Sequence, residues 1–290
     1  MNKFIEVNNL CLSYKNQQVI KNISFSLEQG KIYGLIGRNG AGKTSLLSLL
    51  ASFNQPTAGT IKIDGEVPFE NARIMQKVAF IYDRDFKDES SPVKEMFDTL
   101  KRYRPNFDEE YAKYLLDRFE LPLKKPVNKL SKGKKAALNV TIGLSSRAPI
   151  TIFDEAYLGM DAPTRTFFYK ELLEDQARYP RTFILSTHLV SEMDYLFEEV
   201  LIIHRGELVF HDDFETLLSR GAAITGDSSK VDQFVQGKKK LSEQTLGRTK
   251  SVMIYGNLTE EEKEKARSIG LDIGPVNLQD LFIYLTEEGK

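Results

Sequence analysis

A glycine-rich octet at residues 37–44 stands between a short apolar stretch and a run of leucines. It reads Gly-Arg-Asn-Gly-Ala-Gly-Lys-Thr and fits the pattern of a phosphate-binding loop. Glycines at this spacing let backbone N–H groups close around phosphate oxygens, and the positive end of the following helix attracts the charge. Lys43 is expected to neutralise the β and γ phosphates, and Thr44 to ligate Mg²⁺. The predicted phosphate-binding residues are Gly37, Arg38, Asn39, Gly40, Ala41, Gly42, Lys43, Thr44 and Ser45.

Two carboxylates, Asp154 and Glu155, follow a second apolar stretch. Asp154 is expected to hold Mg²⁺ through water, and Glu155 to polarise the water that attacks the phosphate. Strands often end in acidic residues, so the pair points to a nucleotide site only together with the octet. His188 follows a third apolar stretch, at the carboxyl end of a predicted strand, where open parallel sheets bind ligands. His204 and His211 lie in a later hairpin and are interpreted as structural.

The segment Leu-Ser-Lys-Gly-Lys at residues 130–134 opens a predicted helix, with Ser131 as its N-cap. Lys132, Lys134 and Lys135 then place positive charge in the first turn, where the helix dipole disfavours it. An anion that arrives from elsewhere would relieve this conflict. The alternative is a set of exposed lysines tolerated at a small cost.

Apolar periodicity predicts the elements that position these residues. Residues 1–30 favour short antiparallel strands, and residues 85–146 favour a mostly helical insertion. Strands predicted at 31–36, 150–153, 182–185 and 200–203, with a helix at 165–176, indicate a parallel sheet flanked by helices. A hairpin at 201–210 follows, and residues 222–290 indicate a small separate α+β domain, whose helix at 259–268 begins with a capping box, Thr259 to Glu262.

The composition excludes several classes of protein. Lysine and arginine total 40 in the 290 residues, against 41 aspartates and glutamates, so the net charge of -1 argues against a nucleic-acid-binding face. The longest apolar runs fall far short of the roughly 20 residues of a membrane-spanning helix. The single cysteine, Cys11, excludes an internal disulfide and is interpreted as a small core residue. The first residues of the sequence lack the apolar core of a secretory signal. A cytosolic protein without a metal cluster is predicted.

Taken in order, these motifs resemble the ATP-binding cassette (ABC) family over about residues 3–218. The resemblance implies an α/β fold, that of a P-loop NTPase (RecA-like) cassette. The cassette would span residues 1–220 and contain an antiparallel β subdomain and a helical subdomain at about 85–148. It implies that Tyr14 stacks on adenine and that Asp161 is the aspartate of the D-loop. Two cassettes would sandwich two ATP molecules head to tail, so that Ser131, Lys132 and Gly133 of one subunit meet the γ-phosphate held by Lys43 of the other. Glu155 would orient water, and His188 would contact the γ-phosphate.

The chain departs from the family pattern at three places. Lys132 replaces the first glycine of the LSGGQ signature, and Lys134 replaces its glutamine. Asp83 stands where the family has the Q-loop glutamine; its carboxylate can reach Mg²⁺ directly or through water but is shorter and charged. After the catalytic carboxylates the family has Pro-Thr, whereas this chain has Ala-Tyr, ending at Tyr157.

The departures and the carboxyl-terminal domain resemble exporter-type cassettes of Gram-positive bacteria related to antimicrobial-resistance transporters. The resemblance implies an ATPase subunit that forms a homodimer or heterodimer and is cytoplasmic, peripheral on the inner face of the cell membrane. It would drive export through a separate integral membrane permease, which docks at residues 85–100. Amphipathic or antimicrobial peptides are the expected cargo. Two alternatives remain: a cassette ATPase acting on ribosomes or DNA, and a regulatory or degenerate cassette that binds ATP with little turnover. For residues 222–290 a dimerisation or structural role is expected.

Overall fold

The computed structural model describes residues 3–84 and 86–286. Asp85, the predicted start of the helical subdomain, lies outside the described residues, as do residues 1–2 and residues 287–290 at the end of the predicted carboxyl-terminal domain. The chain divides into two compact units, one formed by Met1–His188 and Leu201–His211 and the other by Leu189–Val200 and Asp212–Lys290. Among the described residues, no helix is long and apolar enough to cross a membrane.

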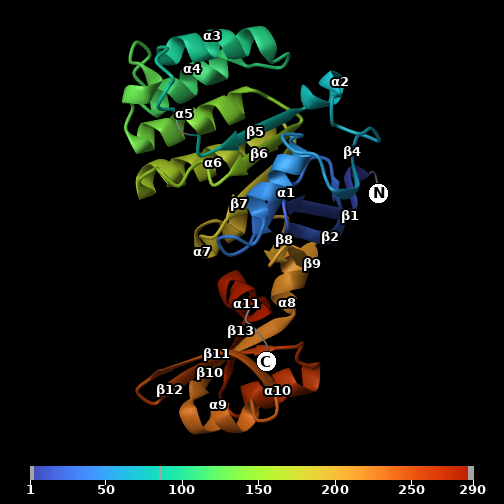
Figure 1. Ribbon diagram of the computed structural model, residues 1–290. Helices are drawn as coiled ribbons and strands as arrows, with labels where there is room; N and C mark the ends of the chain where they lie inside the picture. Colours follow the sequence, from blue (N-terminus) through green and yellow to red (C-terminus); the bar gives the residue numbers. More distant parts are fainter. Residues whose placement is uncertain (1–2, 85, 287–290) are drawn as a thin grey trace. The chain divides into compact units, whose positions relative to one another are not determined.

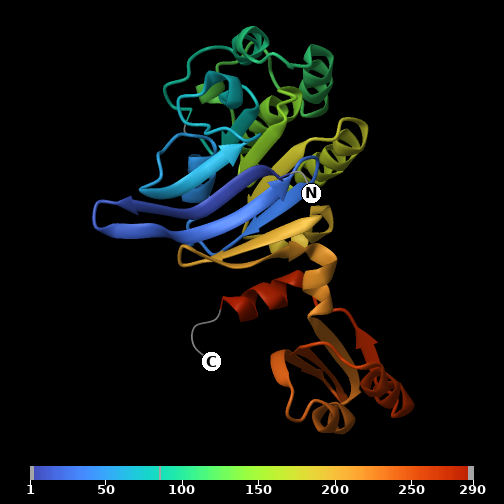
Figure 2. The ribbon, with the colours of Figure 1, turned by 90° about the vertical axis from the view of Figure 1, so that its right-hand side faces the viewer.

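An antiparallel sheet forms the amino-terminal part of the first unit. It has the order β2-β1-β4 and consists of β1 (Lys3–Tyr14), β2 (Gln17–Glu28) and β4 (Ala58–Ile63). In the long hairpin of β1 and β2 (Figure 2), Ile5 lies opposite Leu27 on one side and Ile63 on the other, and all three are buried. Because side chains alternate between the two faces of a strand, the apolar members gather on one face and make a core. The antiparallel pairing predicted here is confirmed, but the predicted short strands are two strands of 12 residues each, because the pairing continues past Asn8 and Asn9 through a register shift.

A six-stranded sheet is the centre of the first unit (Figure 1), with the order β5-β6-β7-β3-β8-β9. Its strands are β3 (Ile32–Ile36), β5 (Val78–Tyr82), β6 (Ile150–Asp154), β7 (Thr182–Thr187), β8 (Glu199–His204) and β9 (Glu207–Asp213). The neighbours β5, β6, β7 and β3 run parallel. Every residue of β3, β6 and β7 is buried, as expected for strands of a parallel sheet covered on both faces. The predicted α/β fold is confirmed.

Helices flank this sheet, as the sequence periodicity predicts. They are α1 (Lys43–Leu50), α2 (Ala72–Met75), α3 (Val93–Tyr103), α4 (Glu109–Arg118), η1 (Val127–Lys129), α5 (Lys132–Ser145) and α6 (Ala162–Arg178). The helices α3, α4 and α5 lie together beside one end of the sheet (Figure 1). α5 packs on β5 and β6, and Phe153 of β6 meets Phe168 of α6 edge to face at 5.4 Å.

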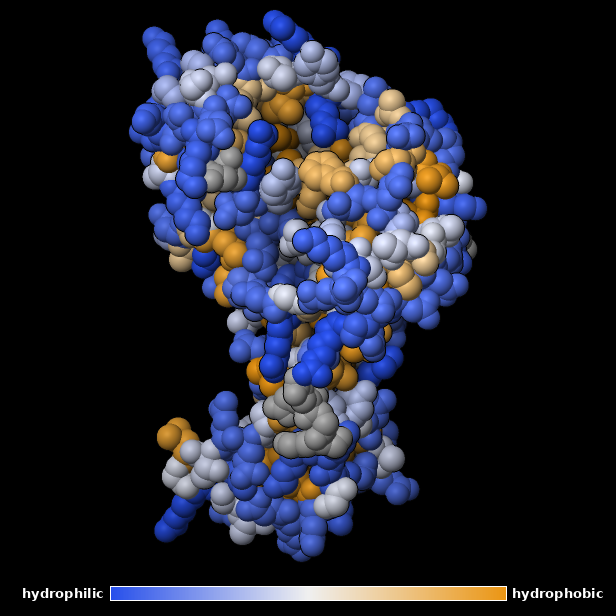
Figure 3. All heavy atoms as spheres, viewed as in Figure 1, coloured by the Kyte–Doolittle hydropathy of each residue, from blue (hydrophilic) through white to orange (hydrophobic). Residues whose placement is uncertain are grey.

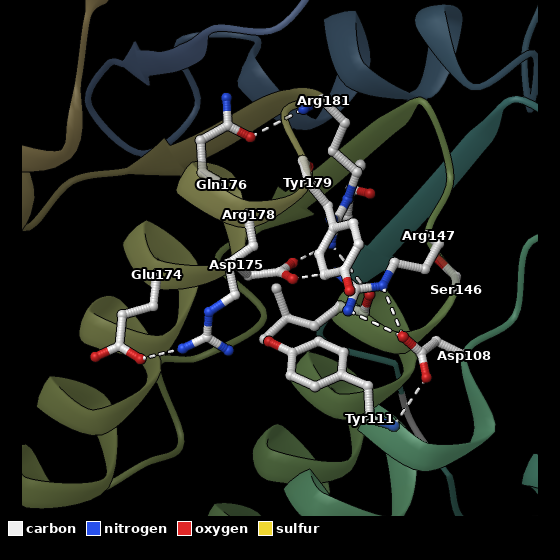
Figure 4. Close-up of polar contacts among 12 residues, drawn as sticks. Asp108, Tyr111, Ser146, Arg147, Glu174, Asp175, Gln176, Arg178, Tyr179 and Arg181 are labelled. Atoms are coloured by element: carbon white, nitrogen blue, oxygen red, sulfur yellow. Dashed lines mark hydrogen bonds and ion pairs between the residues drawn. The ribbon is translucent and has the colours of Figure 1, made fainter.

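A partly buried charge cluster, consisting of Asp108, Tyr111, Arg147, Asp175, Tyr179 and Arg181, joins the helices to the sheet (Figure 4). The Arg147 guanidinium lies between the rings of Tyr111 and Tyr179, at 4.3 and 4.2 Å from their centroids. It pairs with Asp108 at 3.0 Å and with Asp175. Arg181 Nη2 lies 2.6 Å from Asp175 Oδ2. One carboxylate, that of Asp175, therefore neutralises two arginines that enter from different segments.

The second unit contains the helices α7 (Val190–Met193), η2 (Asp194–Leu196) and α8 (Phe214–Ser219). There follow β10 (Gly221–Asp227), α9 (Ser228–Phe234), β11 (Lys239–Leu246), β12 (Thr249–Tyr255), α10 (Glu260–Ser268), β13 (Asp272–Gly274) and α11 (Leu278–Leu285). The strands form an antiparallel sheet of order β11-β12-β10-β13. This order, with a helix after the first and third strands, is the split βαβ arrangement.

An apolar cluster and a set of packed helices stabilise the second unit. Ile224, Val231, Val252 and Ala266 are among the buried residues between the sheet and the helices α9 and α10. α11 packs against α7 and α8 in the same unit. The predicted capping box is confirmed, because Thr259 and Glu262 exchange both of its hydrogen bonds at the start of α10.

Candidate nucleotide-binding site

The glycine loop joins the carboxyl end of β3 to the amino end of α1, which is the strand-loop-helix context the sequence predicts. Gly42, the N-cap of α1, has φ of 108°, a left-handed conformation that a residue with a Cβ rarely adopts. No side chain caps this helix end. Its first N–H groups and its dipole are therefore available to an anion.

A cavity of about 330 Å³ opens at the loop. Its lining is Val19, Arg38, Asn39, Gly40, Gly42, Lys43, Thr44, Ser45 and Glu155. The Lys43 side chain is only 6% exposed, and its Nζ donates to the Gly37 carbonyl at 2.7 Å. Of the predicted loop residues, Gly37 and Ala41 are buried and do not line the cavity. Val19, an apolar residue of β2, was missed, because nothing in its type or spacing separates it from other strand residues.

The registers of the parallel strands bring the remaining motifs to the same edge of the sheet. Asp154 at the end of β6 lies opposite Tyr82 on one side and Ser186 on the other, and Thr187 lies opposite Ile36 at the end of β3. Asp83, which follows Tyr82, is exposed. Since the carboxyl ends of parallel strands are aligned, the loop, the two carboxylates and the histidine face one crevice.

Glu155 lies between Lys43 and His188. Its Oε1 is 2.9 Å from His188 Nδ1 and 3.4 Å from Lys43 Nζ. Its backbone has φ of 51°, in the left-handed region that is uncommon for residues other than glycine and that is found at functional sites. Glu155 thus contacts both of the other residues predicted to be catalytic, and its carboxylate lies beside the cavity where phosphate oxygens would bind.

The predicted magnesium ligands supply hard oxygen donors, which fit Mg²⁺. Asp154 is 6% exposed, and Ser186 Oγ donates a hydrogen bond to its Oδ1. Thr44, in the first turn of α1, is exposed. Among the described residues, no group of three or more His, Cys, Asp or Glu side chains could hold a metal by itself. The donor set therefore suits a cation that also takes phosphate oxygens and waters as ligands.

Tyr14, the predicted adenine partner, ends β1. Its side chain is 45% exposed, and its hydroxyl accepts a hydrogen bond from Asn54 Nδ2 at 3.3 Å. It does not line the phosphate cavity. An adenine contact at Tyr14 stays a prediction, which requires the base to extend beyond that cavity.

The signature segment begins α5 as predicted, with the Ser131 side chain accepting from Lys134 N at 3.3 Å. A Cβ at Gly133 would lie 3.2 Å from the Gly159 carbonyl oxygen, so a glycine here lets α5 approach the loop that follows Glu155. The side chain of Lys134 does not take the position expected of a lysine that meets an incoming anion. Its Nζ donates to the Phe119 carbonyl at 2.7 Å, at the carboxyl end of α4, where the helix dipole favours a cation.

Asp161 is the N-cap of α6, and its Oδ1 accepts from Thr164 N at 2.9 Å. Hydrogen bonds from Thr164 lower the pKa of the Asp161 carboxyl below its ordinary value, so the group is an anion at neutral pH. Its observed contact is a helix cap, and its predicted D-loop role needs a second subunit.

A glycine loop of phosphate-binding pattern, paired carboxylates and a histidine at adjoining strand ends form the candidate site, and the fold is that of ABC ATPase cassettes. One solved structure, of the ATP-binding subunit of an ABC transporter, matches with a TM-score of 0.67 and 23% identity over 74% of this chain and 91% of that one. The model of the ABC transporter family matches residues 20–158. Both similarities are to the ABC transporter family, and the solved structure shows a shared fold.

Two relatives cover nearly the whole chain. The ABC transporter ATP-binding protein YtrB of Bacillus subtilis is 26% identical over 283 residues, which are 96% of this chain and 97% of the relative. The bacitracin transport ATP-binding protein BcrA of Bacillus licheniformis is 26% identical over 306 aligned positions, covering 100% of this chain and 99% of the relative. The similarity to both extends past the cassette into the second unit.

Proposed function

We propose that this protein is the ATP-hydrolysing subunit of an ABC exporter, which dimerises head to tail and drives a separate membrane permease. The observation that carries the proposal is the position of Glu155, whose Oε1 lies beside both Lys43 Nζ and His188 Nδ1 at the mouth of the loop cavity. A carboxylate held there can orient a water molecule toward a γ-phosphate whose charge Lys43 and His188 neutralise.

In the proposed reaction, the water oxygen bonds to the γ-phosphorus while the bond from that phosphorus to the β,γ-bridging oxygen breaks, giving ADP and phosphate. Glu155 orients the water and accepts its proton, and Lys43 and His188 stabilise the charge on the transferred group. Thr44, Asp154 and Asp83 are the proposed ligands of Mg²⁺, which would neutralise the phosphate oxygens when bound.

The dimer in this proposal uses the amino end of α5. Its first turn contains no acidic residue, and Lys132 is exposed there. Ser131, Lys132 and Gly133 of one subunit would therefore offer a hydroxyl, a cation and a helix amino end to the γ-phosphate bound by the other subunit. Asp161 would lie at the same interface.

The proposed permease contact is a groove of about 440 Å³ in the first unit. Phe53, which is 59% exposed, lines it with Phe80 and Tyr82, whose rings lie 5.3 and 6.1 Å from that of Phe53. Hydrophobic side chains gather in a hollow in the region of α3 and β5 (Figure 3). This aromatic surface includes Tyr82, the residue directly before Asp83, and it suits an apolar segment of a permease. Binding to the permease there would place the protein on the inner face of the cell membrane.

For the cargo we propose amphipathic or antimicrobial peptides. The support is the similarity to BcrA, a bacitracin transport ATP-binding protein, and the resemblance of the sequence to the ATPase subunits of the staphylococcal phenol-soluble-modulin exporter. The alternative, a regulatory cassette with little turnover, is favoured by Asp83 in place of the family's glutamine and by the contact of Lys134 with Phe119.

The proposal is tested by reconstitution with a candidate permease, chosen from the neighbouring open reading frames. Purified protein is mixed with vesicles that contain this permease, and ATP-dependent uptake of a labelled amphipathic peptide is measured, with vesicles lacking the permease as control. We expect binding to the vesicles and uptake only when permease and ATP are both present. Absence of both association and uptake would contradict the exporter assignment.

Replacing Tyr14 by alanine is expected to weaken ATP binding about tenfold, because stacking of a base on an aromatic ring contributes about 1–3 kcal/mol. Tyr14→Phe keeps the ring but loses the hydroxyl that accepts from Asn54, so it is expected to bind ATP as the wild type does. Equilibrium titration with ATP measures both. Equal weakening in the two variants would show that the hydroxyl, rather than stacking, is what matters.

A further inference from the structure

Tyr157 lies in the turn that follows Glu155, and its side chain is fully buried. Its hydroxyl donates to the carbonyl oxygen of Ser186 in β7 at 2.9 Å. Ser186 stands two residues before His188. This hydrogen bond thus joins the turn after the carboxylate to the strand that leads to the histidine.

The Tyr157 ring is fixed by α6. It packs against Phe168, with centroids 5.7 Å apart, and meets Tyr169 edge to face at 5.8 Å. Burial raises the pKa of the Tyr157 hydroxyl well above its ordinary value, so the group stays protonated and can donate over the whole working range of pH. Rigid packing and a permanent donor make this bond a fixed distance constraint.

The turn needs such a constraint because of its backbone. Glu155 is held at φ of 51°, which costs about 1–3 kcal/mol for a residue with a side chain unless the surroundings enforce it. Ser186 is held from two directions, since its hydroxyl donates to Asp154 and its carbonyl accepts from Tyr157. The bonds to Ser186 therefore fasten both sides of Glu155 to β7.

We propose that Tyr157 is a positioning residue, which sets the contact between Glu155 and His188 by fastening the turn after Glu155 to the strand before His188. This proposal rests on the proposed function, because the contact matters for the rate only if Glu155 and His188 take part in ATP hydrolysis. Tyr157 itself does not line the phosphate cavity. It gives a physical reason for one of the departures from the family pattern, tyrosine where that pattern has threonine.

The test compares Tyr157→Phe with Tyr33→Phe. Tyr33 is also fully buried, and its hydroxyl donates to a backbone carbonyl, that of Glu28 at 3.1 Å, at the amino end of β3. Both variants lose a buried hydroxyl that bonds to the backbone, so a similar fall in Tm is expected. For each variant, kcat and KM for ATP are measured, and the imidazole signals of ¹³C-labelled histidine are recorded by NMR without nucleotide. The chain has only three histidines, so the His188 signal can be assigned from a His188→Gln spectrum.

We expect Tyr157→Phe to lower kcat about tenfold, the rate equivalent of one hydrogen bond, with KM unchanged and the His188 signal shifted. Tyr33→Phe should leave kcat and the His188 signal as in the wild type. An unshifted His188 signal in Tyr157→Phe, or a fall in kcat equal to that of Tyr33→Phe, would overturn the proposal. If the wild type does not hydrolyse ATP, the proposed function fails, while the His188 signal still decides whether Tyr157 positions the pair.

Discussion

Glu155→Gln is expected to lower the rate of ATP hydrolysis at least about 100-fold while ATP still binds. Glutamine has nearly the same size as glutamate but cannot accept a proton from water, and it removes the charge that faces Lys43 at 3.4 Å and His188 at 2.9 Å. Removing a carboxylate next to the phosphate cavity also removes a repulsion, so ATP affinity should be equal or higher. With hydrolysis blocked, the ATP-bound dimer should accumulate.

Phosphate release, equilibrium ATP binding and the mass in solution with ATP measure these three effects. Glu28→Gln is the matched control, because Glu28 is also a partly exposed carboxylate paired with a lysine, Lys31, at 2.9 Å, and does not line the loop cavity. It should behave as the wild type. Equal and negligible phosphate release by the wild type and Glu155→Gln would instead support the regulatory alternative.

Asp175→Asn is expected to lower the free energy of unfolding by about 3–5 kcal/mol. Asp175 is 2% exposed and faces both Arg147 and Arg181 (Figure 4). Burial lowers the pKa of the Arg181 guanidinium and the Asp175 charge opposes this effect, so the carboxylate compensates a cation that is itself 5% exposed. An asparagine would leave that buried charge without its counterion.

Urea unfolding of the wild type and Asp175→Asn measures the difference. The neighbouring residue offers the control, since Glu174 is 40% exposed and pairs with Arg178 at 2.9 Å on the surface of α6. Glu174→Gln should cost less than about 1 kcal/mol. Comparable small losses in both variants would mean that Asp175 does not stabilise the buried arginines.

The parts of the site that were predictable from sequence depend on short-range patterns. The glycine spacing defines its own loop, and polar residues that end apolar strands must meet at one edge of a parallel sheet. This is why Glu155 and His188, 33 residues apart, could be placed together in advance. The order of the strands in the second unit could not be, because many pairings are compatible with the same alternation of apolar residues.

Other features depend on packing between distant segments. Lys134 reads as an exposed cation in an unfavourable first turn, and only the approach of α4 supplies its acceptor, the Phe119 carbonyl. The sequence suggests ordinary surface charges at Asp175, Arg147 and Arg181. A single sequence position does not show whether its side chain is buried beside an opposite charge. Tyr157 departs from the family pattern, which the sequence shows, but its hydrogen-bond partner on β7 is 29 residues away, and no local pattern predicts that contact.

The second unit includes Leu189–Val200, the twelve residues directly after His188, where α11 packs against α7. A chain shortened after Arg220 would consequently lose the helix that covers this segment, leaving the buried side chains of Val190 and Met193 open to water. Loss of ATPase activity in such a truncated chain could result from disruption of the segment next to His188 as well as from loss of a separate function of the carboxyl-terminal residues. The role of the carboxyl-terminal residues is better probed by surface substitutions or by exchanging the entire unit, residues 189–200 included.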